Sequence, residues 1–417
     1  MDGGQDVVIV GGGAIGVCCA LELARAGAQV TLIEQGAELA WGCSAGNAGF
    51  ICPGHSAPIT SLESLELGLR NLFKPDGAFY LKVDPSLAPW LARFVAACRP
   101  DRARRGADAM RELATASLKL HASLSEEGLA TTFSRRGILV AAETPEGLAS
   151  LVAEGNANAQ AGLRTEQLNG AEARSLEPEL GASVVGGVHY PDEAHCDSAG
   201  FVEAIATAAR DAGAKLQTRV EALRLLRSGG RVGGVETTRG RLRADTVVLA
   251  AGAWTSQLAR DAGVFVPVVG GKGYHVELPD KPSAPRVPVL LKEARVAITP
   301  LSSRVRIGGT FELCGLDESV SPRRVAALVA GATRGMPNLS GRTRLSTWRG
   351  LRPCAPDGVP IIGASERLPN LVLATGHAHM GLALAPITGR LVREIISDEE
   401  PSHDLCAVRP DRFRPLI

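Results

Sequence analysis

The N-terminal part of the chain has the hydrophobic pattern of a strand, a helix and a second strand. Residues 7–10 are a hydrophobic run that ends at a cluster of glycines, a helical pattern follows through Ala26, and residues 30–33 are largely hydrophobic. This order is typical of a βαβ unit. Because the two runs carry few polar residues, we expect both strands to be buried in a parallel sheet.

Helical and strand-like patterns alternate along the rest of the chain. Helices are predicted at residues 107–127, 145–162, 199–212, 322–334 and 382–396. Strands are predicted at 138–142, 215–220, 246–251, 273–278, 296–300, 305–309 and 371–374, with a charged meander over 223–244. Strand–helix segments at both ends and a strand-rich middle predict two domains, through which the chain passes more than once.

Two further stretches have hydrophobic stripes at helical spacing. One stripe contains Leu62, Leu65, Leu69 and Leu72, and the other contains Leu87, Trp90, Leu91, Phe94, Val95 and Cys98. We expect both helices to face the core. Peripheral contact of residues 61–98 with the inner face of the cell membrane is the alternative.

Composition and charge narrow the class of protein. The 45 Lys and Arg residues balance 44 Asp and Glu residues, so no basic surface for a nucleic acid is expected. The nine cysteines are odd in number and form no CxxC pair, which is typical of a reduced, cytoplasmic protein. No signal peptide or membrane-spanning helix is predicted. The 48 glycines favour a large bound cofactor, because glycine lets a backbone lie against a ligand.

The glycine cluster at the first turn predicts a dinucleotide site. Gly11, Gly13 and Gly16 form GxGxxG between the first strand and its helix, where the backbone can approach a pyrophosphate. The helix N-terminus then faces the phosphates. Glu34, at the end of the second strand, is expected to bind the ribose hydroxyls and to disfavour NADP.

Other segments bear on whether the cofactor is FAD or NAD. The strand at 246–251 ends in small residues, which suits a strand that reaches a dinucleotide, although it also suits an ordinary strand end. The glycine-rich turn at 375–382 opens a helix whose N-terminus could stabilise a reduced flavin. The chain has no second GxGxxG, so we expect electrons to leave to an acceptor other than NAD.

Several segments resemble the D-amino acid oxidase/dehydrogenase family of flavoproteins. Besides GxGxxG with Glu34, they are 44–53, 272–274, 308–312, 348–358 and 375–382. The resemblance runs almost end to end and is strongest to bacterial FAD-dependent D-amino acid dehydrogenases, including those that act on D-proline and cis-4-hydroxy-D-proline.

This resemblance implies an α/β fold with two domains. A Rossmann-like (GR2-type) FAD-binding domain would contain residues 1–80, 191–262 and 346–417. A substrate-binding domain on a mixed or antiparallel sheet would contain 81–190 and 263–345. The expected cofactor contacts are Gly11, Gly13, Ala14, Ile15, Gly16, Glu34, Gln35, Ser44, Asn47, Ala48, Gly49, Val220, Ala251, Gly252, Trp254, Gly376, Met380, Gly381 and Leu382. Some relatives attach FAD to a cysteine where this chain has Gly350, so we expect non-covalent FAD.

The resemblance also implies a substrate site. Arg352 matches the family's carboxylate-binding arginine, and a planar guanidinium is suited to fix a carboxylate bidentately. Tyr274 is expected either to donate to the same carboxylate or simply to pack. His55 and His379 are candidate pocket residues, and Met380 would favour an apolar or cyclic side chain.

Some candidate residues have no clear role at this stage. His377 and His379 form HxH, but without a third ligand we expect no metal site. The sequence assigns no role to Lys272 or Arg306.

The prediction is therefore an FAD-dependent enzyme that oxidises D-amino or imino acids by hydride transfer from Cα to flavin N5. Its products would be an imine or 2-oxo acid, and a quinone or another redox protein would accept the electrons. The alternatives are an oxygen-using oxidase of glycine or sarcosine, a 2-hydroxy acid dehydrogenase, and a flavin subunit that only relays electrons.

Overall fold

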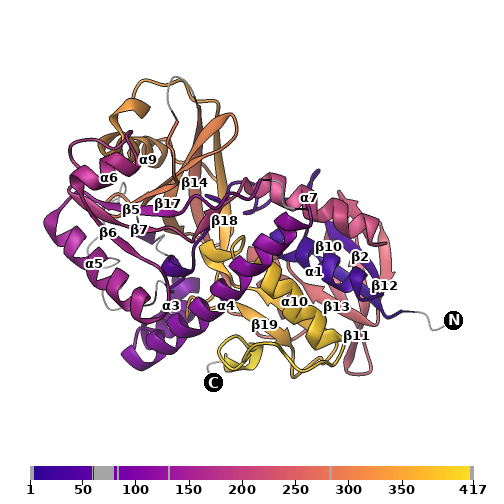
Figure 1. Cartoon of the computed structure of the whole chain (residues 1–417). Helices are drawn as coiled ribbons and strands as arrows, with labels where there is room; N and C mark the ends of the chain where they lie inside the picture. Colours follow the sequence, from indigo (N-terminus) through magenta and orange to yellow (C-terminus); the bar gives the residue numbers. More distant parts are fainter. Residues whose placement is uncertain are drawn as a thin grey trace.

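The computed structural model describes residues 4–58, 60, 79–81, 84–129, 132–280 and 284–413. Two large sheets, each with its own helices, lie side by side, and helix α4 (Pro100–Glu126) crosses between them (Figure 1). The leucine stripe predicted at 62–72 lies outside the described residues.

The first sheet has the strand order β19–β20–β13–β1–β2–β9. Its strands are β1 (Asp6–Val10), β2 (Gln29–Glu34), β9 (Lys215–Thr218), β13 (Thr246–Leu249), β19 (Ile361–Ala364) and β20 (Leu371–Thr375). All neighbours pair in parallel except β19 and β20, which are antiparallel. Strands from both ends and the middle of the chain therefore meet in this sheet, and β1 and β2 pair in parallel, as the βαβ pattern predicts.

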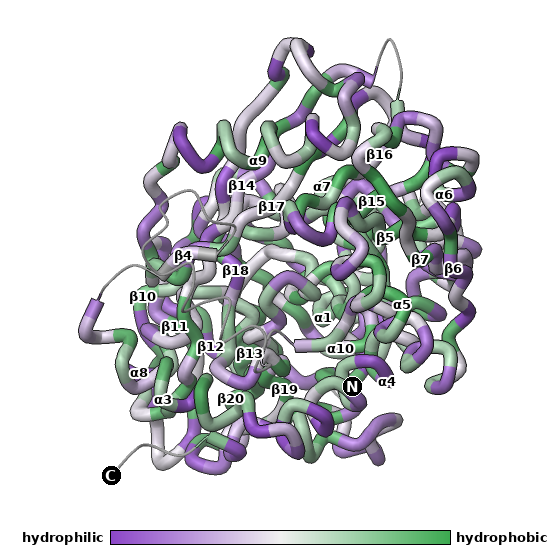
Figure 2. Tube along the Cα trace, turned by 90° about the vertical axis from the view of Figure 1, so that its left-hand side faces the viewer, coloured by the Kyte–Doolittle hydropathy of each residue, from purple (hydrophilic) through white to green (hydrophobic). Residues whose placement is uncertain are grey.

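Both faces of the first sheet are covered. In β1, Val7 and Ile9 point into one hydrophobic cluster, and Val8 and Val10 point into another. The first cluster is covered by α1 (Ala14–Arg25), α4, α7 (Ser198–Asp211) and α10 (Ala385–Ile396), and the second by α8 (Thr255–Asp261) and the small sheet β10 (Ala222–Ser228), β11 (Arg231–Thr237) and β12 (Gly240–Arg243). The chain around α1 and β13 is accordingly hydrophobic in Figure 2.

The second sheet has nine strands and mixed pairing. Its order is β18–β14–β17–β16–β15–β5–β7–β6, with β4 paired to β17. The strands are β4 (Phe79–Leu81), β5 (Ile138–Ala142), β6 (Glu166–Asn169), β7 (Gly186–Tyr190), β14 (Val269–Pro279), β15 (Val289–Leu291), β16 (Val296–Pro300), β17 (Arg304–Leu313) and β18 (Ser346–Cys354). Helices α3 (Ala88–Ala97), α5 (Pro145–Gln160), α6 (Gly170–Leu176) and α9 (Pro322–Gly335) accompany it.

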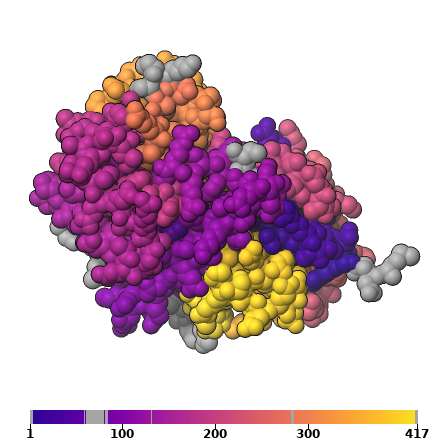
Figure 3. Space-filling model, in the orientation of Figure 1, coloured from indigo at the N-terminus to yellow at the C-terminus, as the bar shows by residue number. Residues whose placement is uncertain are grey.

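Short elements complete the described chain. A two-stranded sheet pairs β3 (Phe50–Ile51) with β8 (Ala194–His195). The 3-10 helices are η1 (Pro53–His55), η2 (Pro85–Leu87), η3 (Gly252–Trp254), η4 (Pro337–Leu339), η5 (Ala378–Met380) and η6 (Pro410–Arg412). Figure 3 shows the N-terminal unit, α4 and the C-terminal segment packed together on one face.

The predicted fold class is confirmed, with differences in detail. The segment 346–354, predicted to belong with the first sheet, is the edge strand β18 of the second sheet. The helix predicted at 107–127 begins earlier, at Pro100, and the last helix begins at Ala385 rather than near Leu382. Residues 378–380 instead form the 3-10 turn η5.

The second hydrophobic stripe faces the core. Trp90, Phe94 and Cys98 are buried in one cluster, and the Trp90 indole N–H donates to the carbonyl of Cys354 at 3.0 Å. Only Val95 of this stripe is largely exposed. No helix among the described residues is long and apolar enough to span a bilayer.

Candidate cofactor and substrate site

A cavity of about 480 Å³ lies at the carboxyl ends of the first sheet's central strands. It is lined from β1 and β2 through the turn after β13 to the C-terminal turn at 374–382, and by Leu351 and Pro353 of β18. In open parallel sheets, ligands bind at this edge. Both sheets therefore contribute to one site.

The turn after β1 has the geometry that a pyrophosphate needs. Gly11 has φ +113°, and a Cβ on Gly16 would lie 1.9 Å from the Gly11 carbonyl oxygen, so only glycine fits at either position. Helix α1 begins without a side-chain cap at Gly13 and has no acidic residue in its first turn. Its N-terminus can therefore receive an anion.

Glu34 is held at the end of β2 by backbone amides. Its Oε2 accepts a hydrogen bond from the N–H of Gly12 and its Oε1 accepts one from the N–H of Gly36, each at 2.7 Å. The carboxylate is buried and lines the cavity. Each oxygen keeps a second lone pair, which can accept from a ribose hydroxyl.

Arg352 projects from the face of β18 that also carries Trp348. Its Nη1 donates to the carbonyl of Thr310 at 2.9 Å, and Gly273 on β14 leaves room for the guanidinium. The side chain is partly exposed and forms no ion pair with any carboxylate in the described part of the chain. It does not itself line the 480 Å³ cavity, but its neighbours Leu351 and Pro353 do.

Tyr274 lies on the opposite face of the second sheet, which corrects the prediction that it could share a carboxylate with Arg352. In the β14–β18 ladder, Gly273 pairs with Gly350 and Tyr274 with Arg349, so Tyr274 and Arg352 point to opposite sides. The buried Tyr274 hydroxyl accepts from the N–H of Ser321 at 3.3 Å. The hydroxyl is also hydrogen-bonded to Glu312, so Tyr274 is engaged on the side of the sheet away from Arg352.

His379 lies near both Arg352 and His55. Although His379 has exposed surface, the protein packed around it desolvates the imidazole and, together with the Arg352 charge, lowers its pKa to about 4. His55 is mostly buried, and its Nδ1 lies 3.0 Å from Oε1 of Glu154. His379 is therefore neutral at pH 7 and can accept a hydrogen bond from a ligand.

The two histidines of HxH do not converge. His377 is buried, and its Nε2 lies 3.0 Å from the hydroxyl of Thr388, whereas His379 is exposed. Within the ranges that the structure describes, no group of three or more His, Cys, Asp or Glu side chains could hold a metal ion.

Comparisons with known proteins give the family. Residues 6–395 match the family described as FAD dependent oxidoreductase. The D-amino acid dehydrogenase of Paramagnetospirillum magneticum is 32% identical over 99% of both chains. The D-amino-acid oxidase of Bradyrhizobium diazoefficiens is 32% identical over 99% of this chain and 100% of its own. The crystal structure of glycine oxidase from Geobacillus kaustophilus matches with a TM-score of 0.81 and 25% identity over 99% of both chains.

The chain belongs to this family of FAD-dependent oxidoreductases. FAD is its cofactor, as the sequence predicted. The cavity fits this group, because an uncapped helix N-terminus, a buried glutamate and the C-terminal turn all line it.

Most of the predicted cofactor contacts of this oxidoreductase line the cavity. They are Gly11, Gly13, Ala14, Ile15, Glu34, Gln35, Ser44, Asn47, Val220, Ala251, Gly252, Trp254, Gly381 and Leu382. Their roles toward FAD stay predictions, but the structure brings them together.

Five predicted contacts do not line the cavity. Gly16 packs on Gly11, Gly49 packs on the carbonyl of Cys196, and Gly376 packs on Ala355. The Ala48 carbonyl faces the second sheet and accepts a hydrogen bond from Thr299. These four residues shape the surrounding backbone.

Met380 is the fifth and requires a correction. It is 2% exposed, belongs to the hydrophobic core of the first sheet and does not line the cavity. The preference for an apolar or cyclic substrate that we derived from this side chain is therefore unsupported.

Sequence reasoning missed several lining residues. Trp41 and Cys43 come from the loop after β2, and Gln257, Arg260 and Asp261 come from α8. The α8 residues follow Trp254 at spacings of three, six and seven, so a helical-face analysis beyond Trp254 could have found them.

Proposed function

We propose that this oxidoreductase oxidises the CH–NH group of D-amino acids, giving an imine or 2-oxo acid, and passes the electrons to an acceptor other than NAD. The observation that carries the proposal is Arg352, a partly exposed guanidinium without an ionic partner in the described chain, beside the cofactor cavity. The dehydrogenase and oxidase names of the relatives support the substrate class.

Arg352 is suited to bind the substrate carboxylate. With Nη1 bonded to Thr310, the guanidinium keeps further N–H groups for a charge-assisted contact. The neutral ring of His379 adds no competing positive charge and can accept a hydrogen bond from the substrate amine. The two side chains together would orient the Cα–H bond.

FAD, when bound, supplies the hydride acceptor. We propose that it is held non-covalently by the first sheet's turns, while the second sheet supplies Arg352. The domain division follows this division of roles, except that β4 and β18 belong with the second sheet and that α4 packs on the first. The acceptor that we propose is a quinone or another redox protein.

The test is anaerobic mixing of the FAD-loaded enzyme with a panel of amino acids. We expect D-amino acids to bleach the visible flavin band and the L-enantiomers to leave it unchanged. D-Proline and cis-4-hydroxy-D-proline belong in the panel because of the sequence resemblance. Bleaching by 2-hydroxy acids alone, or by no compound, would contradict the proposal.

An oxygen-using glycine oxidase is the second candidate, favoured by the similarity to the glycine oxidase of Geobacillus kaustophilus. Peroxide formation in air distinguishes it. We expect slow peroxide formation with every substrate and fast reduction of a quinone analogue, and the reverse pattern would favour the oxidase.

Arg352→Met tests the carboxylate contact. Losing a charge-assisted bidentate bond costs about 3 kcal/mol, so kcat/KM should fall about 100-fold or more while FAD stays bound. Arg349→Met is the matched control, because Arg349 lies on the other face of β18 and pairs with Glu318 at 3.0 Å. Equal kinetics in the two variants would refute the assignment.

A further inference from the structure

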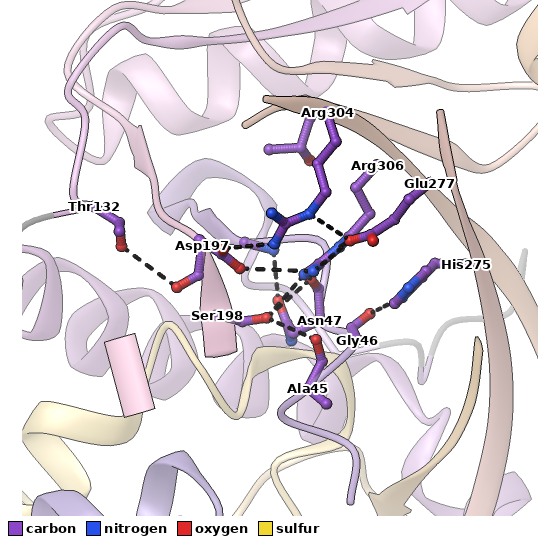
Figure 4. Close-up of polar contacts among 12 residues, drawn as sticks. Ala45, Gly46, Asn47, Thr132, Asp197, Ser198, His275, Glu277, Arg304 and Arg306 are labelled. Carbon is purple, nitrogen blue, oxygen red and sulfur yellow. Dashed lines mark hydrogen bonds and ion pairs between the residues drawn. The ribbon is translucent and has the colours of Figure 1, made fainter. Parts of the chain in front are cut away.

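Side chains of the second sheet hold the loop at 44–49, which lies against the cofactor cavity. His275 Nδ1 lies 3.2 Å from the carbonyl oxygen of Gly46, and the Thr299 hydroxyl donates to that of Ala48 at 2.6 Å. Between them, Arg306 Nη1 donates to the carbonyl of Asn47 at 2.7 Å (Figure 4). Three successive carbonyls of the loop thus face polar side chains of β14, β16 and β17.

Arg306 is the most constrained of these side chains. It is 3% exposed, and its Nη2 donates to Glu277 at 2.9 Å while its Nη1 also donates to Ser198 at 3.0 Å. Although burial opposes ionisation of Glu277, the hydrogen bonds and charges of Arg306 and Arg304 lower its pKa to about 2. The guanidinium therefore keeps its charge partner at any working pH and cannot easily rotate away from the loop.

The loop passes this restraint on to the cofactor site. The Asn47 side chain donates to the carbonyl of His379 at 3.2 Å and accepts from the N–H of Gly49 at 2.8 Å. At the other end of the loop, the Ser44 hydroxyl accepts from the N–H of Ala14 at 2.9 Å, in the first turn of α1. One loop thus connects the turn after β1 (the phosphate turn), the C-terminal turn and the second sheet.

We propose that Arg306 is a positioning residue for FAD. It fixes the Asn47 carbonyl, so that the loop at 44–49 and the C-terminal turn are already in their binding conformation before the cofactor arrives. Preorganisation of this kind raises affinity by reducing the ordering that binding requires. The inference rests on FAD as the cofactor and not on the identity of the substrate.

Arg304 provides a matched control within the same network. It pairs with Asp197 at 2.6 Å and with Glu277 at 2.8 Å, the carboxylate that it shares with Arg306. Its side chain hydrogen-bonds to Glu277 and Asp197 and to no residue of the loop. If the network were merely structural, replacing either arginine would change FAD affinity equally. If Arg306 positions the loop, only the replacement of Arg306 weakens FAD binding.

The experiment compares Arg306→Met with Arg304→Met. After FAD removal, its dissociation constant is measured by flavin fluorescence, and amide hydrogen exchange of the loop is measured in the apoprotein. Losing a hydrogen bond to a charged group changes an equilibrium constant about tenfold or more. We therefore expect R306M to raise the dissociation constant of FAD about 10-fold and to speed amide hydrogen exchange in the loop. R304M should change the dissociation constant less than about 3-fold at a similar loss of thermal stability.

Further variants and readouts keep the test decisive. If R306M does not fold, R306K retains the charge with fewer donors, and an intermediate increase in the dissociation constant is expected. Thr299→Val, which removes the bond to Ala48, should also weaken FAD binding. Equal effects in R306M and R304M, or wild-type FAD affinity in R306M or R306K, would overturn the proposal. These measurements need no amino acid, so their outcome is independent of the substrate assignment.

Discussion

Glu193 is a carboxyl group in a place that favours its neutral form. It is 4% exposed, its Oε1 accepts from the N–H of Gly54 at 2.5 Å, and its Oε2 has no partner among the described residues. Burial raises its pKa to about 8, against the opposing effects of the Gly54 amide and of His55. Its proton is therefore held in the folded protein at pH 7.

This raised pKa predicts how stability depends on pH. The unfolded chain loses this proton near the ordinary pKa of a glutamate, whereas the folded protein keeps it to about pH 8. The contribution of Glu193 to folding stability is therefore complete below the ordinary pKa and is lost as pH rises toward 8. The loss is at most about 5 kcal/mol. We expect Glu193→Gln, which cannot ionise, to flatten the fall in melting temperature between pH 5 and pH 8.

The control for this prediction is Glu126→Gln at the exposed end of α4. This variant should keep the pH dependence of the wild-type protein. A Glu193→Gln protein whose melting temperature falls with pH as steeply as that of the wild type would show that Glu193 does not carry the linkage.

At the scale of elements, the pairing of β14 with β18 decides where Arg352 points. A Cβ on Gly273 would lie 2.2 Å from Nη1 of Arg352, at the movable end of a flexible side chain. Gly273→Ala should therefore displace the guanidinium rather than the backbone. We expect KM for the amino acid to rise about 10-fold while stability changes by less than about 1 kcal/mol.

Gly308→Ala on the adjacent strand β17 is the matched control. A Cβ at Gly308 meets no atom closer than 3.9 Å, so the substitution should leave KM unchanged. Steady-state kinetics and thermal melts of both variants are the measurements. An unchanged KM in Gly273→Ala would mean that Arg352 does not depend on this glycine.

The same elements show what the sequence could and could not predict. The βαβ unit was predictable because its strands are continuously hydrophobic and its glycines are fixed by backbone geometry. Strand β18 was not, because Arg349, Gly350 and Arg352 interrupt any hydrophobic alternation in it. Its position at the sheet edge relaxes the need for such a pattern, since fewer neighbours bury it.

Register explains the mistakes at the site. The sequence predicts Tyr274 and Arg352 for the same site. Only the pairing of Gly273 with Gly350 shows that their side chains point to opposite faces of the sheet. Arg306 received no role because its partners, Asn47 and Glu277, become neighbours only after the second sheet meets the loop. Contacts between distant segments have no local signature.

At the scale of the whole molecule, the cofactor cavity joins parts of the chain that are far apart. The phosphate turn and Glu34 belong to the first sheet, while the loop at 44–49 is held by the second. A ligand that contacts only the turn stabilises the first sheet. FAD, which would extend along the whole cavity, should stabilise both.

This arrangement predicts an order of stabilisation when ligands are added to the apoprotein. We expect FAD to raise the melting temperature most and ADP, which reaches only the phosphate turn and Glu34, to raise it less. FMN lacks the adenosine and should have the smallest effect. At equal ligand concentration, a ligand at a hundredfold excess over its dissociation constant adds about 2.7 kcal/mol and a weaker ligand adds less, so thermal melts can resolve this order. Glu34→Ala removes the adenosine contact, so it should abolish the effect of ADP on the melting temperature and leave that of FMN. In the unsubstituted protein, an FMN shift equal to that of FAD would contradict a site built around the first βαβ turn.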